Sequence, residues 1–109
     1  MNKLLHLPLK SQWYLMIELG IKKEEYREIN DYWCKRLLEK PLQYYVPFGD
    51  VNKANPNISF RYFDVARLRY GYTKKFMDFP KPAIRIGRGN PDWGAPTDRD
   101  VFIISLNKK

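Results

Sequence analysis

The first apolar pattern in the chain has the period of a β-strand. Leu5, Leu7 and Leu9 alternate with other side chains, so they would share one face of a strand. Pro8 cannot donate a hydrogen bond to a neighbouring strand, which puts this segment at the edge of a sheet or at the end of its own pairing. We therefore expect a strand at residues 4–9.

A helical period follows the strand. Trp13, Met16 and Ile17 have the i, i+3, i+4 spacing of one apolar helix face. Ser11 is a good N-cap, and Gly20 stands where a helix often ends on a residue with positive φ. The helix would lie between these two residues and stop abruptly at the glycine.

The rest of the chain alternates short apolar segments with turn formers. A second helix begins after Asn30 or Asp31, and Pro41 ends it. The last apolar segment is hydrophobic on both faces, which indicates a central strand. The expected elements are helices at 12–19 and at 32–38 or 32–40, strands at 4–9, 23–29, 43–46, 59–63, 65–70, 76–79, 83–86 and 101–106, and long loops at 47–58 and 87–97.

Two early helices followed by many short strands indicate the α+β class, in the form of a small β-barrel with two helices packed on one side. With 109 residues, of which 44% are hydrophobic, the chain predicts a single domain spanning residues 1–109.

Several classes of protein are disfavoured by composition. The single Cys34 excludes an internal disulfide framework. Because the chain has only one histidine, His6, beside this cysteine, a zinc site and a histidine-based catalytic triad are both disfavoured. No apolar run approaches the length of a membrane span. The apolar segment at the start of the given sequence is too short and too interrupted for a signal peptide. We expect a cytoplasmic protein with no cofactor, metal or membrane partner, and with a passive thiol at Cys34.

Positive charge is concentrated in the second half of the chain. The net charge is +8, and residues 61–88 hold eight basic residues against Asp64 and Asp78, interleaved with six aromatic residues. This mixture is typical of nucleic-acid binding, where cations follow phosphates and rings stack on bases. Strand alternation alone gives the same mixture if the rings face a barrel interior and the cations face water.

The densest group of opposed charges follows Gly20. Glu25 and Arg27 would share one face of the strand at 23–29, with Lys22 at the turn before it. Lys22 is a candidate base or fixed cation, and Glu25 is a candidate general base or orienting group. Arg27 is a candidate ligand for a phosphate or a carbonyl oxygen. The structural alternative is a Glu–Arg salt bridge that joins the helix to the sheet.

The pattern G-x-K-x-x-E-x-R, formed by Gly20, Lys22, Glu25 and Arg27, resembles the signature of the ASCH domains, a branch of the PUA-like β-barrels. Most of the chain is similar to these proteins, including compact members found in phages and prophages. The resemblance implies that the three charged residues line a cleft beside the first helix, and that the chain binds RNA, a nucleotide or a modified nucleoside.

The resemblance also implies an enzymatic alternative. Some ASCH proteins are amidohydrolases of acylated cytidine, and others are thought to cut RNA. A hydrolase here would use Lys22 and Glu25, but the amidohydrolases carry a Thr at the position of Glu25, and a Glu does not replace a hydroxyl nucleophile. The amidohydrolases also use a second carboxylate later in the chain, for which only Asp64 and Asp78 are candidates here.

We therefore expect RNA or nucleoside binding, with a small hydrolase as the first alternative and a protein-interaction adaptor as the second. Trp93 would either cap the barrel or stack on a base. The expected ligand-binding residues are Lys10, Lys22, Glu25, Arg27, Arg67, Arg69, Tyr70 and Trp93.

Overall fold

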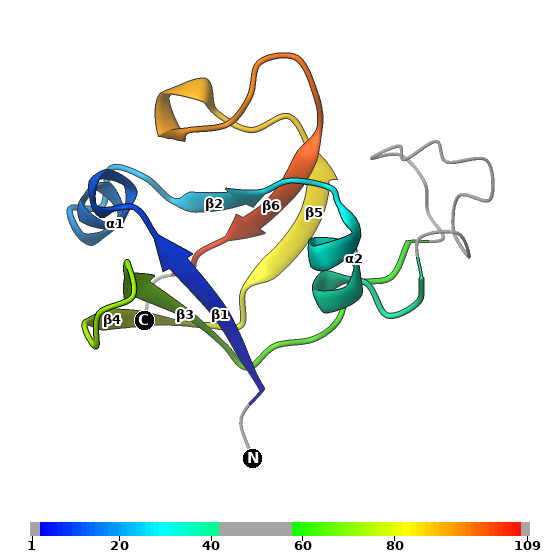
Figure 1. Ribbon diagram of the computed structural model, residues 1–109, viewed down its shortest axis with the longest axis horizontal. Coiled ribbons are helices and arrows are strands. Elements are labelled where there is room, and N and C mark those ends of the chain that lie inside the picture. Colours follow the sequence, from blue (N-terminus) through cyan, green and yellow to red (C-terminus); the bar gives the residue numbers. More distant parts are fainter. Residues whose placement is uncertain (1–2, 42–57, 108–109) are drawn as a thin grey trace. The chain divides into compact units, whose positions relative to one another are not determined.

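The computed structural model describes residues 3–41 and 58–107, which form an α+β arrangement of two α-helices, six strands and one 3-10 turn (Figure 1). The α+β class is thereby confirmed. The strand expected at 43–46 and residues 47–57 of the first long loop lie outside the described residues.

The chain divides into two compact units. The first unit draws its described residues from segments 3–25, 62–83 and 104–107, and the second unit from 26–41, 58–61 and 84–103. The strands form two three-stranded sheets, with the orders β1-β3-β4 and β2-β6-β5. A closed PUA-like barrel and a single domain both stay predictions.

The sheet of the first unit contains β1 (Leu4–Leu9), β3 (Val65–Tyr70) and β4 (Phe76–Pro80) (Figure 1). β1 runs parallel to β3, and β4 runs antiparallel to it. β1 is thus an edge strand, as Pro8 predicted. The expected strands at 4–9 and 65–70 have the expected bounds.

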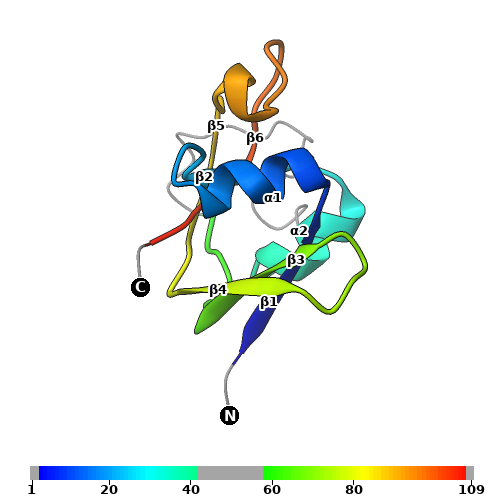
Figure 2. The same ribbon diagram turned by 90° about the vertical axis from the view of Figure 1, so that its left-hand side faces the viewer.

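One face of this sheet builds the core of the first unit. Side chains of β1 and β3 on this face are buried, and helix α1 (Ser11–Glu18) lies against β3 (Figure 2). The buried members of α1 are Tyr14 and Ile17, whereas Trp13 and Met16 are half-buried. The buried sheet residues are Leu5, Leu7, Leu9, Ala66 and Leu68.

The two ends of α1 differ from each other in how they are capped. The helix begins one residue earlier than expected, with Lys10 at the N-cap and no side-chain hydrogen bond there, so the predicted cap at Ser11 is wrong. At the other end Gly20 has φ +78°. Its N–H donates to the Ile17 carbonyl at 3.0 Å, and the next N–H, of Ile21, donates to Met16 at 2.9 Å. This is a Schellman motif, and it confirms the expected role of the glycine.

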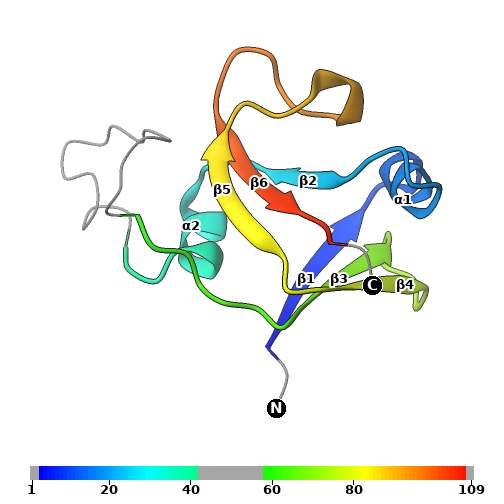
Figure 3. The same ribbon diagram turned by 180° about the vertical axis from the view of Figure 1, so that it is seen from behind.

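The second sheet contains β2 (Glu24–Arg27), β6 (Val101–Ser105) and β5 (Ala83–Gly87), with β6 in the centre (Figure 3). The first four residues of β6 are buried, as expected for a central strand. Helix α2 (Asp31–Leu37) belongs to the second unit, and the Asn30 side chain caps it by accepting a hydrogen bond from the Trp33 N–H at 2.9 Å.

The strand expected at 59–63 is wrong. Only an isolated bridge forms there, between Leu38 and Phe60, flanked by a hydrogen bond from the Arg61 N–H to the Leu37 carbonyl at 2.8 Å. The same bridge explains why α2 ends before Pro41, because Leu38 has an extended backbone in order to pair. The strand expected at 23–29 is shorter, since β2 covers only Glu24–Arg27.

Candidate functional site

The turn after α1 places Lys22 directly against the last helical turn. Its N–H donates to the Met16 carbonyl at 3.1 Å, in addition to the two bonds of the Schellman motif. The Lys22 Nζ lies 3.0 Å from Glu25 Oε1 and 4.7 Å from the centre of the Trp13 ring. The backbone of the turn and the contact with the ring therefore fix the ammonium group opposite the carboxylate.

The ion pair is enclosed by protein. The side chains of Lys22 and Glu25 are only 2% and 7% exposed. Burial strengthens the attraction within the pair but makes the loss of either partner costly, because the remaining charge would stay away from water. The two groups have the proximity that an acid–base pair requires, but the enclosure leaves a substrate no direct approach to them.

Arg27, the third residue expected in this cleft, and Lys10, which was expected to bind a ligand, have different surroundings. Lys10 is exposed at the start of α1, whereas Lys22 follows its end, and a helix of eight residues is about 12 Å long. Arg27 belongs to the second unit, where its guanidinium lies 5.0 Å from the centre of the Trp33 ring. Among the described residues, no group of three or more His, Cys, Asp or Glu side chains is placed to hold a metal ion.

A second cluster lies on the face of the first sheet opposite its core, which we call the open face. The strand register aligns Arg67 with Asp78, and Arg69 with Phe76, in neighbouring rows. On β1, His6 lies opposite Arg67 and is exposed. The open face consists of Leu4, His6, Pro8, Val65, Arg67, Arg69, Phe76, Asp78 and Pro80.

Arg67 is held in place on the open face. Its Nε and Nη2 donate to the two carboxylate oxygens of Asp78, each at 2.9 Å. These hydrogen bonds raise the pKa of Arg67 above its usual value, because they favour the charged guanidinium. The same group lies 4.2 Å from the centre of the Phe76 ring. The planar guanidinium of Arg67, held by two hydrogen bonds, thus lies beside the ring of Phe76, which is 44% exposed.

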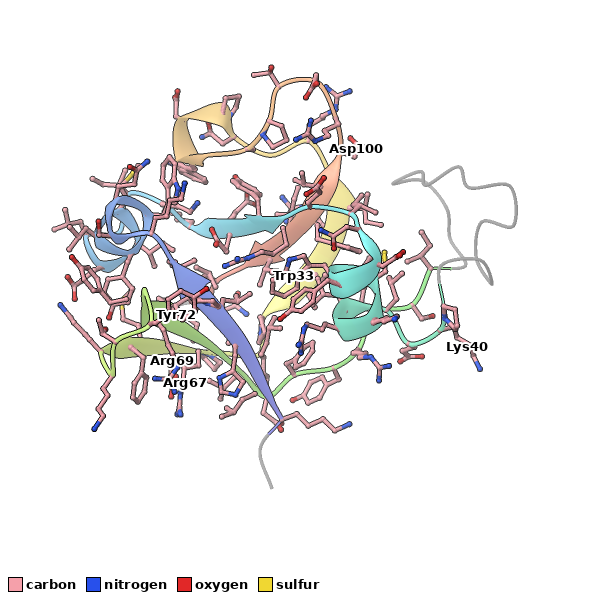
Figure 4. All side chains as sticks on the ribbon, viewed as in Figure 1. Trp33, Lys40, Arg67, Arg69, Tyr72 and Asp100 are labelled. Atoms are coloured by element: carbon pink, nitrogen blue, oxygen red, sulfur yellow. The ribbon has the colours of Figure 1, made fainter. Side chains whose placement is uncertain are left out.

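Arg69 lies near the same ring but forms no ion pair with any described residue. Its guanidinium lies 5.6 Å from the centre of the Phe76 ring. Figure 4 shows Arg67 and Arg69 on strand β3. The two arginines expected to bind a ligand are therefore together; Asp78 fixes the orientation of the Arg67 guanidinium, whereas no ion pair among the described residues fixes that of Arg69.

Tyr70 lies on the opposite side of β3 from the two arginines. Its ring contacts Tyr14 edge to face, with 5.2 Å between ring centres, on the side of the sheet that α1 covers. Burial, and then the charge of Glu18, raise the pKa of the Tyr14 hydroxyl. The Lys75 Nζ lies 5.5 Å and 5.6 Å from the two ring centres and 3.7 Å from Glu18. These contacts show that Tyr70 packs against other side chains. The composition of the window at 61–88 had instead led us to expect it among the ligand-binding residues, with the arginines.

The turn between β3 and β4 presents a residue that sequence reasoning missed. Tyr72 is 97% exposed in a turn that Gly71 opens with φ +60°, and the Thr73 hydroxyl donates to the Tyr70 carbonyl at 2.6 Å. Lys74 beside it is exposed. Its position in a turn after a glycine was the available signal that the ring of Tyr72 would be free of the core.

The eight basic residues of the window 61–88 are divided between the two units. Arg61, Arg85 and Arg88 belong to the second unit, and the remaining five basic residues to the first. Arg88 is a structural residue, because it donates to Asp100 at 3.1 Å and to the Thr97 carbonyl at 2.9 Å.

Trp93, the remaining predicted site residue, is half-buried in the 3-10 turn η1 (Pro91–Trp93) of the second unit. The Asn90 side chain caps this turn, and the Asn90 N–H donates to the Tyr26 hydroxyl at 3.0 Å. Gly89 packs so closely that an added Cβ would lie 2.6 Å from the Tyr26 ring. Trp93 is thus part of a tightly built loop.

Comparison of the chain with protein-family models, with curated proteins and with solved structures gives no match. The resemblance to ASCH domains therefore stays a prediction, carried by the four residues of the motif.

Proposed function

We propose that this chain is an RNA-binding domain of the ASCH type, with a PUA-like fold, and that it contacts RNA through the open face of its first sheet and the turn between β3 and β4. The observation that carries the proposal is the exposed ring of Phe76 lying beside two guanidinium groups, on a sheet whose other face is core.

The chemistry of this surface suits a polyanion with flat bases. Arg69 and Lys74 offer positive charge to phosphates, and Phe76 and Tyr72 offer exposed rings for stacking. Strand alternation, the alternative explanation for the basic and aromatic mixture, applies to Tyr70, whose ring faces the core side. It does not apply to Phe76, which shares the open face with the cations.

The Lys22–Glu25 pair has a structural role in this proposal. Its enclosure and its hydrogen-bonded turn fix the chain between α1 and β2. A ligand that reached Lys22, as the ASCH resemblance implies for a nucleotide or modified nucleoside, would have to displace Trp13 or Glu25 first. We therefore assign the first contact with RNA to the open face.

Fluorescence anisotropy with a labelled single-stranded RNA of about 12 nucleotides tests the proposal. Binding should weaken steeply between about 50 and 200 mM salt, because bound cations release counterions from the RNA. Lys74→Gln should lower the slope of log K against log salt by about 0.7, the value for one phosphate contact on a single strand. Lys35→Gln, which removes one exposed charge from α2, is the matched control and should leave the slope unchanged.

Absence of RNA binding at low salt would overturn the proposal. Equal losses in Lys74→Gln and Lys35→Gln would also contradict it, because they would show a diffuse response to net charge rather than a defined surface.

A further inference from the structure

The two arginines beside Phe76 differ in what they are free to do. Arg67 donates two of its five N–H groups to Asp78, so its guanidinium cannot turn without breaking both hydrogen bonds. Arg69 has no ion pair in the described part of the chain. The guanidinium of Arg67 therefore has a fixed orientation beside the ring, and that of Arg69 can turn toward a ligand.

The ring between them is suited to stacking. Phe76 is 44% exposed on the open face, and the residues in its row, Pro8 and Arg69, lie on neighbouring strands of the same sheet. A phenyl ring has no hydrogen-bonding group, so it contributes area and a π-face but reads no sequence. Bases in a double helix already stack on each other and do not offer their faces to such a ring, whereas unpaired bases do.

We infer that the open face selects single-stranded RNA by stacking one unpaired base on Phe76, with Arg69 contacting the adjacent phosphate and Arg67 acting as a positioning residue for the ring. This inference rests on the proposed function. It adds the class of RNA, the residue that stacks and the reason for the Arg67–Asp78 pair.

Replacing Asp78 provides a test, because two explanations predict opposite changes in RNA affinity. If the surface attracted RNA by charge alone, Asp78→Asn would strengthen binding, because it removes a negative charge from the open face. If the carboxylate positions Arg67 and through it the ring, the same substitution weakens binding to single strands. Arg67→Lys keeps the charge and loses the two-pronged geometry, so it should weaken binding as well.

The experiment compares a single-stranded RNA with a duplex of the same sequence, by anisotropy at one low salt concentration. The wild type should bind the single strand about tenfold more tightly, and Phe76→Leu should remove most of this preference while Phe76→Tyr keeps it. Tyr32→Leu, which removes a ring that is 56% exposed on α2, is the matched control and should have no effect. Circular dichroism confirms that each variant is folded.

The outcomes separate the two claims. RNA binding with equal affinity for both forms, or binding that Asp78→Asn strengthens, overturns the inference and leaves the proposed function standing. Failure to bind either RNA overturns both.

Discussion

The Lys22 ammonium lies 3.0 Å from the Glu25 carboxylate, and both side chains are more than nine-tenths buried. Replacing only one of them would leave an unpaired charge in the interior. We expect Lys22→Ala and Glu25→Ala each to lower the free energy of unfolding by about 3–5 kcal/mol, measured by urea denaturation.

A double-mutant cycle provides the control for this prediction. Lys22→Met combined with Glu25→Leu removes both charges, so its loss should be much smaller than the sum of the losses measured for Lys22→Met alone and for Glu25→Leu alone. Additive losses would mean that the pair does not act as a unit.

The cap after α1 gives a second stability prediction. Gly20 has φ +78° with no atom within 4 Å of an added Cβ, so Gly20→Ala meets backbone strain but no clash. We expect a loss of about 1 kcal/mol in the free energy of unfolding. Ser11→Ala is the control, because no side-chain hydrogen bond caps the start of this helix and its loss should fall within about 0.5 kcal/mol. A larger effect at Ser11 than at Gly20 would contradict this description.

The sequence predicted those elements whose signal is local. The alternation of Leu5, Leu7 and Leu9 predicted β1, and a segment apolar on both faces predicted the central β6. The segment at 59–63 failed because its pairing partner is Leu38, a contact set by tertiary structure rather than by the strand's own pattern. Tyr14 was missed as a core residue because the predicted stripe consisted of Trp13, Met16 and Ile17 and left it out.

The candidate site was predictable in part for the same reason. Period-2 alternation places Arg67 and Arg69 on one face, and the structure agrees. The alternation also places Tyr70 on the other face, but the expectation followed the composition of the window instead. The partnership of Arg67 with Asp78 depends on the register between β3 and β4, which no local pattern specifies.

Asp64 gives a prediction for the pH dependence of stability. Its carboxylate accepts a hydrogen bond from the Lys3 N–H at 2.7 Å, which is the main cause of a pKa below its usual 3.8. A lowered pKa in the folded state stabilises the fold above the unfolded value, and this contribution disappears as the pH falls through the folded value. Between about pH 5 and 2, wild type should therefore lose more stability than Asp64→Asn. In acid denaturation experiments Asp98→Asn, which changes an exposed carboxylate, should behave as wild type does; identical curves for all three proteins would refute the prediction.

Cys34 is expected to react slowly. The thiol is buried in α2, and burial, followed by the charge of Asp31, raises its pKa. Because the thiolate is the reactive form, we expect modification by a thiol reagent to be on the order of 100-fold slower in the native protein than in guanidinium chloride. Comparable rates in the two states would show that the thiol is accessible.

The central claim is that RNA binds the open face of the first unit, and one pair of variants tests it most directly. Arg69 and Arg36 each lie over an aromatic ring, Phe76 and Tyr32 respectively, and Arg36 belongs to the second unit. The affinity of Arg69→Gln and Arg36→Gln for the same single-stranded RNA should be measured at one low salt concentration. The proposal predicts that Arg69→Gln binds about tenfold more weakly than wild type while Arg36→Gln is unchanged. Equal weakening in both variants, or a loss only in Arg36→Gln, would contradict it.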